Sequence, residues 1–183
     1  MLGMSAKTPV AKKSTKELEE KLADTSLEDK DKPKRTAEDF KKMKLRYTWV
    51  FWVRPPVQKT GTFVEYEKTL HSLLKFSNVN DFGLAFKSQK RPSSLPVVTD
   101  KHLFKDGIRP IWEDDDNKNG GKWELRLKKG IVDRYWEETQ FALVGDMFDD
   151  SEEICGAVIS MRNGEDILSM WLRNDNNKNV RIR

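Results

Sequence analysis

The sequence has little of what secreted proteins, membrane proteins and most metalloproteins need. Its one cysteine, Cys155, excludes an internal disulfide, and its two histidines, His71 and His102, are too far apart to give a metal-ligand spacing. The longest apolar run, residues 49–53, is too short to cross a bilayer, and the first residues lack the apolar segment of a secretory signal. A reducing compartment fits this composition, and nothing directs the chain to secretion or to a membrane.

Motifs of common enzyme classes are also missing. The sequence has no P-loop and no G-x-S-x-G, and Cys155 lies in an apolar strand pattern without a basic neighbour in sequence. The acidic run at residues 113–116 offers oxygen ligands for a divalent ion, but a run of adjacent acids is more often a solvated loop. We therefore expect no enzyme, no cofactor and no metal.

Charge is unevenly distributed along the chain. Residues 1–44 hold twelve Lys or Arg and nine Asp or Glu, and the remaining 139 residues are nearly neutral. This composition predicts a disordered charged tail over residues 1–44, with a transient helix at residues 16–23, followed by one folded domain over residues 45–183. Because the domain carries almost no net charge, general duplex binding through phosphate charge is a weak interpretation of the pI near 9.0.

The pattern changes to aromatic and β-branched residues at Leu45, and RYTWVFWV predicts a first strand that ends at Pro55 and Pro56. Residues 70–76 fit either a strand or a helix. Ser77 is a plausible N-cap for a following helix that carries Val79, Phe82, Ala85 and Phe86.

Two later stretches have clearer periods. KWELRLKK alternates apolar and charged residues, which predicts a half-buried antiparallel strand with Trp123 toward the core. In DRYWEETQFALVGDMF, Trp136, Leu143, Val144 and Met147 recur at helical spacing and predict an amphipathic helix lying on a sheet.

Asn163-Gly164 predicts a hairpin between two strand-like runs. If these two residues form the turn, opposing residues have numbers that sum to 327. One face then carries Ala157, Ile159, Met161, Leu168 and Met170 for the core, and the other carries Val158, Ser160, Arg162, Ile167, Ser169 and Trp171. We expect a ligand on the second face, because a large Trp and an Arg share it.

Trp112 has an unusual setting among the six tryptophans. It leads directly into EDDDNKNGG, a stretch with no apolar side chain, whereas Trp49, Trp52, Trp123 and Trp136 lie in strand or helix patterns typical of a core. A tryptophan at the mouth of an acidic loop is a candidate ligand-binding residue, although indoles are often only partly buried for other reasons.

The strings HLFKDGIRPIWEDDDNKNGGKW and RYWEETQFALVGDMFDDSEEICGAV, followed by Arg162 and Trp171, resemble the translation initiation factor 4E family of mRNA cap-binding proteins. The resemblance runs from about Leu45 to Arg173. It implies an α+β fold in which a curved antiparallel sheet has helices on its convex face and the cap slot on its concave face. Tyr66 and Ile167 resemble class II, the 4E homologous proteins, whereas the major factor has Trp and Lys at these positions.

The resemblance also implies how the 7-methylguanosine cap of mRNA binds. Tyr66 and Trp112 stack on the cationic base, Glu113 accepts its N1–H and N2–H donors, and Trp171 packs on the N7-methyl group. Arg162 and Lys122 meet the phosphates. The family has a Lys at position 167 and an Arg at position 122, so we expect weaker cap binding than in the major factor.

A second set of residues corresponds to the family's convex partner face, which grips a scaffold factor or repressor through a Tyr-x-x-x-x-Leu-apolar helix. Val79 and Glu138 match that face, and Phe141 lies near them in sequence. Gly83 stands where the family has a tryptophan, and Glu137 stands at an apolar position. We expect these two departures to weaken such binding. The family also continues beyond the position of Arg183, so the domain is expected to be shortened at its C-terminal end.

The resulting hypothesis is a cytoplasmic, monomeric factor, with the nucleus left open as a second location. It binds capped mRNA and acts in translation initiation or its regulation, and we favour a class II repressor that competes for caps. The alternative is a protein-interaction module of the same fold that has lost cap binding.

Overall fold

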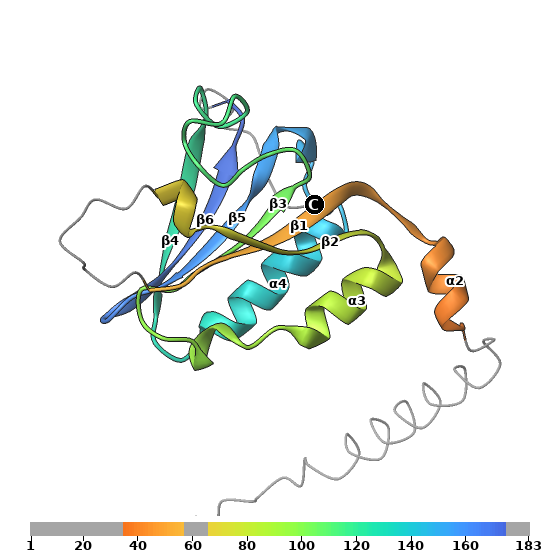
Figure 1. The fold of residues 1–183 in the computed structure, drawn as a ribbon, viewed down its shortest axis with the longest axis horizontal. Helices are drawn as coiled ribbons and strands as arrows, with labels where there is room; N and C mark the ends of the chain where they lie inside the picture. The colour runs from red at the N-terminus through yellow and green to blue at the C-terminus, as the bar shows by residue number, and fades with distance from the viewer. Residues whose placement is uncertain (1–34, 57–65, 175–183) are drawn as a thin grey trace, which may run out of the picture. The chain divides into compact units, whose positions relative to one another are not determined.

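A computed structural model describes residues 35–56 and 66–174, and the residues from Ala37 on belong to one compact unit. Its described part contains a six-stranded antiparallel sheet in the order β2-β1-β3-β5-β6-β4 (Figure 1). The strands are β1 (Lys44–Arg54), β2 (His71–Asn78), β3 (Asp100–Lys105), β4 (Gly121–Lys128), β5 (Ile154–Met161) and β6 (Glu165–Leu172). The helices are α2 (Ala37–Lys42), α3 (Val79–Ser88) and α4 (Val132–Val144), with short 3-10 turns η1 (Tyr66–Thr69), η2 (Pro92–Ser94) and η3 (Ser151–Glu153).

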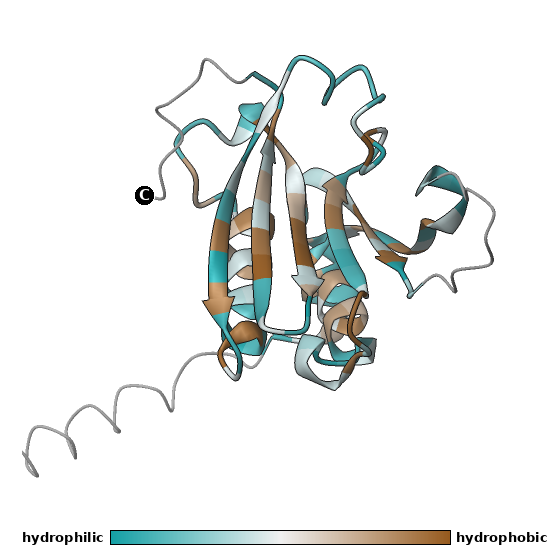
Figure 2. Ribbon diagram, turned by 90° about the vertical axis from the view of Figure 1, so that its left-hand side faces the viewer, coloured by the Kyte–Doolittle hydropathy of each residue, from teal (hydrophilic) through white to brown (hydrophobic). Residues whose placement is uncertain are grey.

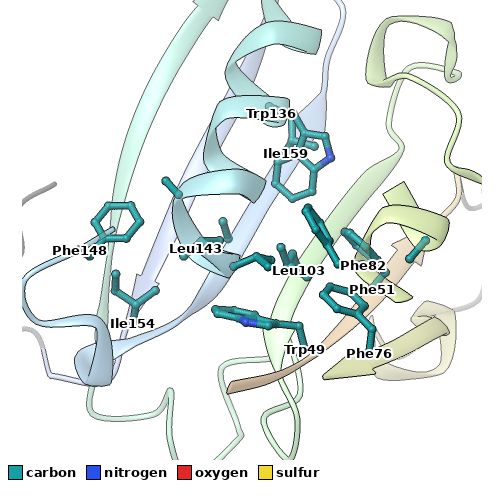
Figure 3. Close-up of a cluster of buried hydrophobic side chains, with 14 of the residues drawn as sticks. Trp49, Phe51, Phe76, Phe82, Leu103, Trp136, Leu143, Phe148, Ile154 and Ile159 are labelled. Carbon is teal, nitrogen blue, oxygen red and sulfur yellow. The ribbon is translucent and has the colours of Figure 1, made fainter. Parts of the chain in front are cut away.

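The sheet is curved, and α3 and α4 cover one of its faces, which confirms the predicted α+β class (Figure 1). Figure 2 shows the sheet from its other, open side, with the helices behind the strands. The main core lies between the sheet and the helices, where Trp136 and Leu143 of α4 meet Trp49, Leu103 and Ile159 of the strands (Figure 3). A smaller cluster, made of Phe104, Ile108, Cys155, Val158 and Trp171, lies apart from this core.

The first strand and the segment after it follow the sequence pattern. β1 spans Lys44–Arg54, which confirms the predicted strand, and residues 71–78 form a strand rather than a helix. The predicted N-cap was wrong by one residue. Asn78, not Ser77, caps α3, because its extended backbone lets its side-chain oxygen accept a hydrogen bond from the Asp81 N–H at 2.9 Å.

The hairpin register is confirmed. Ile159 pairs with Leu168, Ala157 with Met170 and Ser160 with Ile167, so opposing numbers sum to 327 as expected. An irregularity interrupts this rule between Ile154 and Gly156. The two faces therefore separate as predicted, and Ala157, Ile159 and Met161 belong to the main core.

Two side chains that were expected in the core are exposed. Trp123 is 57% exposed on β4, because within residues 35–56 and 66–174 β4 is the outermost strand and pairs only with β6, so few described neighbours reach over it. Met147 is 46% exposed. The helix pattern was wrong there because α4 ends at Val144, where Gly145 caps it and the positive φ of Asp146 turns the chain away.

The charged N-terminal segment is helical at its end. The predicted tail was wrong for residues 37–42, which form α2 with Glu38 and Asp39 in the first turn and Lys41 and Lys42 in the last. The acidic residues lie near the partly positive N-terminal end of the helix and the basic residues near its partly negative C-terminal end, and both attractions stabilise this short helix. The helix expected at residues 16–23 lies outside the described residues. Among those described, we find no helix with the length and apolarity to cross a membrane.

Candidate functional site

A cavity of about 420 Å³ opens on the side of the sheet opposite α3 and α4, and we call it the slot. Its size falls within the range of about 300–1,000 Å³ that is usual for small-molecule sites. The structure brings all six residues of the predicted cap site to its wall, from η1, the loop before β4, β4 itself and the β5–β6 hairpin. They are Tyr66, Trp112, Glu113, Lys122, Arg162 and Trp171.

The loop that carries Trp112 and Glu113 is held by buried polar side chains. Asn117 is fully buried and donates hydrogen bonds of 2.8 Å to the carbonyl oxygens of Arg109 and Ile111. Asp114, 7% exposed, accepts from the Arg109 N–H and from its guanidinium. The acidic run is therefore not solvated throughout, because the Asp114 carboxylate is buried where it accepts from the backbone N–H groups of Arg109 and Asp116. The same contacts fix the backbone on which Trp112 stands.

Tyr66 begins η1 and is 42% exposed. Arg54 places its guanidinium carbon 4.6 Å from the centre of the Tyr66 ring, and the same guanidinium donates to Thr69 Oγ1 at 2.9 Å. The Tyr66 hydroxyl lies 3.4 Å from Nε2 of His102, which is fully buried. Burial raises the pKa of Tyr66 and lowers that of His102 to about 4, so both side chains are neutral at pH 7.

Trp112 stacks on Trp171, with ring centroids 4.0 Å apart and planes inclined by 27°. Trp171 is buried by this contact and by Phe104 beneath it, whereas Trp112 is 42% exposed. The sequence placed Trp171 on the ligand side of the hairpin, and the structure adds that it supports the Trp112 ring from one face. Aromatic pairs of this kind contribute about 0.5–1.5 kcal/mol beyond their buried area.

Each basic side chain of the slot has an acidic partner. Lys122 Nζ lies 2.7 Å from Glu124, and Arg162 lies 2.8 Å from Asp100. Arg54 reaches the same Asp100 at 3.4 Å. The lining therefore holds three cations and three acids, the third acid being Glu113.

Three charged residues of the slot wall were not predicted from the sequence: Arg54, Asp100 and Glu124. Glu124 was accessible from sequence, because it follows Lys122 by two positions on a predicted strand and so faces the same side. Arg54 and Asp100 depend on the pairing of β1 with β3, which joins residues about 50 positions apart and also places the buried His102 beside the Tyr66 hydroxyl. No local pattern could have revealed that pairing.

The predicted partner-face residues lie on α3 and α4, on the other side of the sheet from the slot. Val79 and Gly83 belong to α3, and Glu137, Glu138 and Phe141 belong to α4. The two helices meet where Phe141 contacts Phe82 and Phe86 at centroid distances of 5.6 and 5.2 Å. A side chain added at Gly83 would meet no atom within 4 Å of its Cβ, so the space beside this position is open.

Fold and slot together define a class: an α+β protein whose curved sheet carries a cavity lined by aromatic rings and charged side chains, the size of a small-molecule site. A family model described as eukaryotic initiation factor 4E matches residues 44–183. The chain belongs to this family. The 4E family consists of cap-binding factors and not of enzymes, which confirms the sequence-based expectation of a non-enzyme.

Relatives from plants and a nematode support the assignment. The chain is 46% identical over 132 residues to eukaryotic translation initiation factor NCBP of Triticum aestivum, covering 71% of this chain and 56% of the wheat protein. It is 36% identical over 166 residues to eukaryotic translation initiation factor 4E-4 of Caenorhabditis elegans, covering 90% and 76%. The chain thus spans just over half the length of the NCBP relative.

Solved structures show the same fold. Ascaris suum eIF4E-3, crystallised with an m2,2,7G cap, matches with a TM-score of 0.69 and 32% identity, covering 74% of this chain and 76% of that one. C. elegans eIF4E-3, in complex with the 4E-binding protein Mextli and a cap analog, matches with a TM-score of 0.69 and 32% identity, covering 74% and 77%.

Proposed function

We propose that this chain binds the 7-methylguanosine cap of mRNA in the slot. The observation that carries the proposal is the convergence of Tyr66, Trp112, Glu113 and Arg162 on one cavity, from segments that are distant in sequence. The family assignment and the cap ligands of the two eIF4E-3 structures support it.

The base is recognised through its positive charge and its edge. N7-methylation makes guanine a cation, and a cation between two electron-rich rings gains about 1–3 kcal/mol from each stack and roughly 2 kcal/mol from cation–π attraction when desolvated. Tyr66 is neutral with Arg54 over its ring, and Trp171 covers one face of Trp112, so the base stacks on the uncovered face of each ring. Glu113 accepts the two guanine donors as a charge-assisted pair, which selects guanine over adenine.

The phosphates are met by Lys122 and Arg162. Both side chains are in ion pairs before ligand arrives, with Glu124 and Asp100 respectively. A phosphate must compete with Glu124 for Lys122 and with Asp100 for Arg162, which lowers its contribution to affinity. This agrees with the expectation of weaker cap binding than in the major factor, which has a Lys in place of Ile167 and an Arg in place of Lys122.

In the cell the chain acts on translation of capped mRNA in the cytoplasm, as a monomer and as a class II repressor that competes for caps. Tyr66 and Ile167 are the residues that favour class II. Val79, Glu138 and the exposed Phe141 form the surface for a partner helix. Binding of the usual Tyr-x-x-x-x-Leu-apolar helix is weakened at Gly83, which has no side chain, and at Glu137, whose side chain is charged, because neither residue supplies an apolar contact.

A retention experiment tests the proposal. The purified chain is applied to resin that carries 7-methyl-GTP, and bound protein is eluted with free cap analogue or with GTP. We expect retention, with elution by the cap analogue and none by GTP at equal concentration. A folded sample that flows through the resin would refute cap binding and favour the alternative, an interaction module that has lost it.

A further inference from the structure

Glu124 is an acid at the phosphate side of the slot. It lies on β4 two positions after Lys122, and alternate residues of a strand face the same side. Its carboxylate is 2.7 Å from Lys122 Nζ, and both residues line the slot. The Lys122 ammonium lowers the pKa of Glu124, so the carboxylate is ionised at neutral pH.

Asp100, the second acid that pairs with a slot cation, differs from Glu124 in burial and in the number of its cations. The Asp100 side chain is 4% exposed and is shared by Arg54 and Arg162, so this group keeps one net positive charge. The Glu124 side chain is 38% exposed and has Lys122 as its cation, so that pair is neutral. A phosphate chain that reaches toward Lys122 therefore meets a negative charge at the same place.

We infer that Glu124 is a specificity-determining residue that weakens binding of the phosphate chain, so that the slot selects its ligand by the methylated base. This inference rests on the proposed function. Its consequence is that mono- and triphosphate forms of the methylated nucleotide bind this chain with similar affinity. The substrate class is then a methylated guanine nucleotide with little dependence on phosphate number.

The structure supplies a matched control. Glu165 of β6 forms an ion pair with Arg126 of β4, and its side chain is 40% exposed, close to the 38% of Glu124. Glu165 is the first residue of β6 and lies opposite Lys128 in the strand register, and neither residue lines the slot. Glu124→Gln and Glu165→Gln change the net charge equally, so a difference between them reports the position of the charge alone.

The experiment measures dissociation constants of the full chain and both variants for 7-methylguanosine, 7-methyl-GMP and 7-methyl-GTP at two salt concentrations. From the attraction between single charges near a protein surface, we expect Glu124→Gln to bind 7-methyl-GTP about three- to tenfold more tightly, with a larger gain at low salt. For the nucleoside we expect a change below about twofold, since it carries no phosphate charge. Glu165→Gln should match the unaltered chain with all three ligands.

A second variant tests the same pair independently. Lys122→Met with Glu124→Gln removes both charges of a neutral pair, so its affinity for 7-methyl-GTP should stay within about twofold of the unaltered chain. Equal gains for nucleoside and triphosphate, or no gain in Glu124→Gln, would overturn the inference while cap binding stands. No binding of any methylated ligand to the unaltered chain would overturn the proposed function and the inference together.

Discussion

Replacing Trp112 by Ala removes one wall of the slot. The ring is 42% exposed and stacks on Trp171, so its loss leaves no buried cavity and forfeits one aromatic pair. From the lost pair and the buried part of the ring, we expect the free energy of unfolding to fall by about 1–2 kcal/mol. Binding should suffer far more. One stack at about 2 kcal/mol together with about 1 kcal/mol of cation–π attraction gives a loss of about 3 kcal/mol, or a hundredfold in affinity.

Isothermal titration calorimetry with 7-methyl-GTP measures this loss, and circular dichroism checks the fold of each sample. Trp123→Ala is the matched control, because Trp123 is also an exposed indole, at 57%, and lies outside the slot. We expect its affinity to be unchanged. If Trp112→Ala bound within about threefold of the unaltered chain, or if Trp123→Ala lost as much, the stacking argument would be refuted.

Two further predictions concern the rest of the domain. Gly83→Ala should raise the free energy of unfolding by about 0.5–1 kcal/mol, because glycine weakens a helix and the new methyl group meets no atom; chemical denaturation checks this, and a lower stability would contradict it. His102 is fully buried with a pKa lowered to about 4, so between pH 6.5 and pH 4 the unfolded chain binds the extra proton and stability falls as pH falls. Titration of His102 should make the folded chain up to about 3 kcal/mol more stable above this window than below it. Urea denaturation at pH 7 and pH 5 checks this, because His102→Gln should lose the His102 part of the stability difference. An identical pH dependence in both proteins would contradict it.

Local patterns were enough to predict much of the fold. The turn at Asn163-Gly164 set the hairpin register, and the register alone assigned Trp171 and Arg162 to the ligand side. The alternation in β4 gave the strand but overestimated burial of Trp123, because a pattern does not say which strand is outermost.

The site was predictable where residues are neighbours in sequence and less so where they meet through the sheet. Trp112 was a candidate because of its acidic surroundings, and the resemblance supplied Tyr66, Glu113 and Lys122. The Trp112–Trp171 stack and the Asp100 ion pairs could not be anticipated, because each joins segments more than 45 residues apart in sequence. The burial of Asp114 and Asn117 was not anticipated either, because it follows from their hydrogen bonds to backbone groups of the Trp112 loop.

The most direct test of the central claim is a titration of the full chain with 7-methyl-GTP and with GTP at fixed salt, repeated with Glu113→Gln. Methylation adds the positive charge that the rings attract, so we predict at least about tenfold tighter binding of the methylated nucleotide. Glu113→Gln should weaken binding of the methylated nucleotide more than Lys122→Ala does. Equal affinity for 7-methyl-GTP and GTP would contradict recognition of the cationic base in this slot.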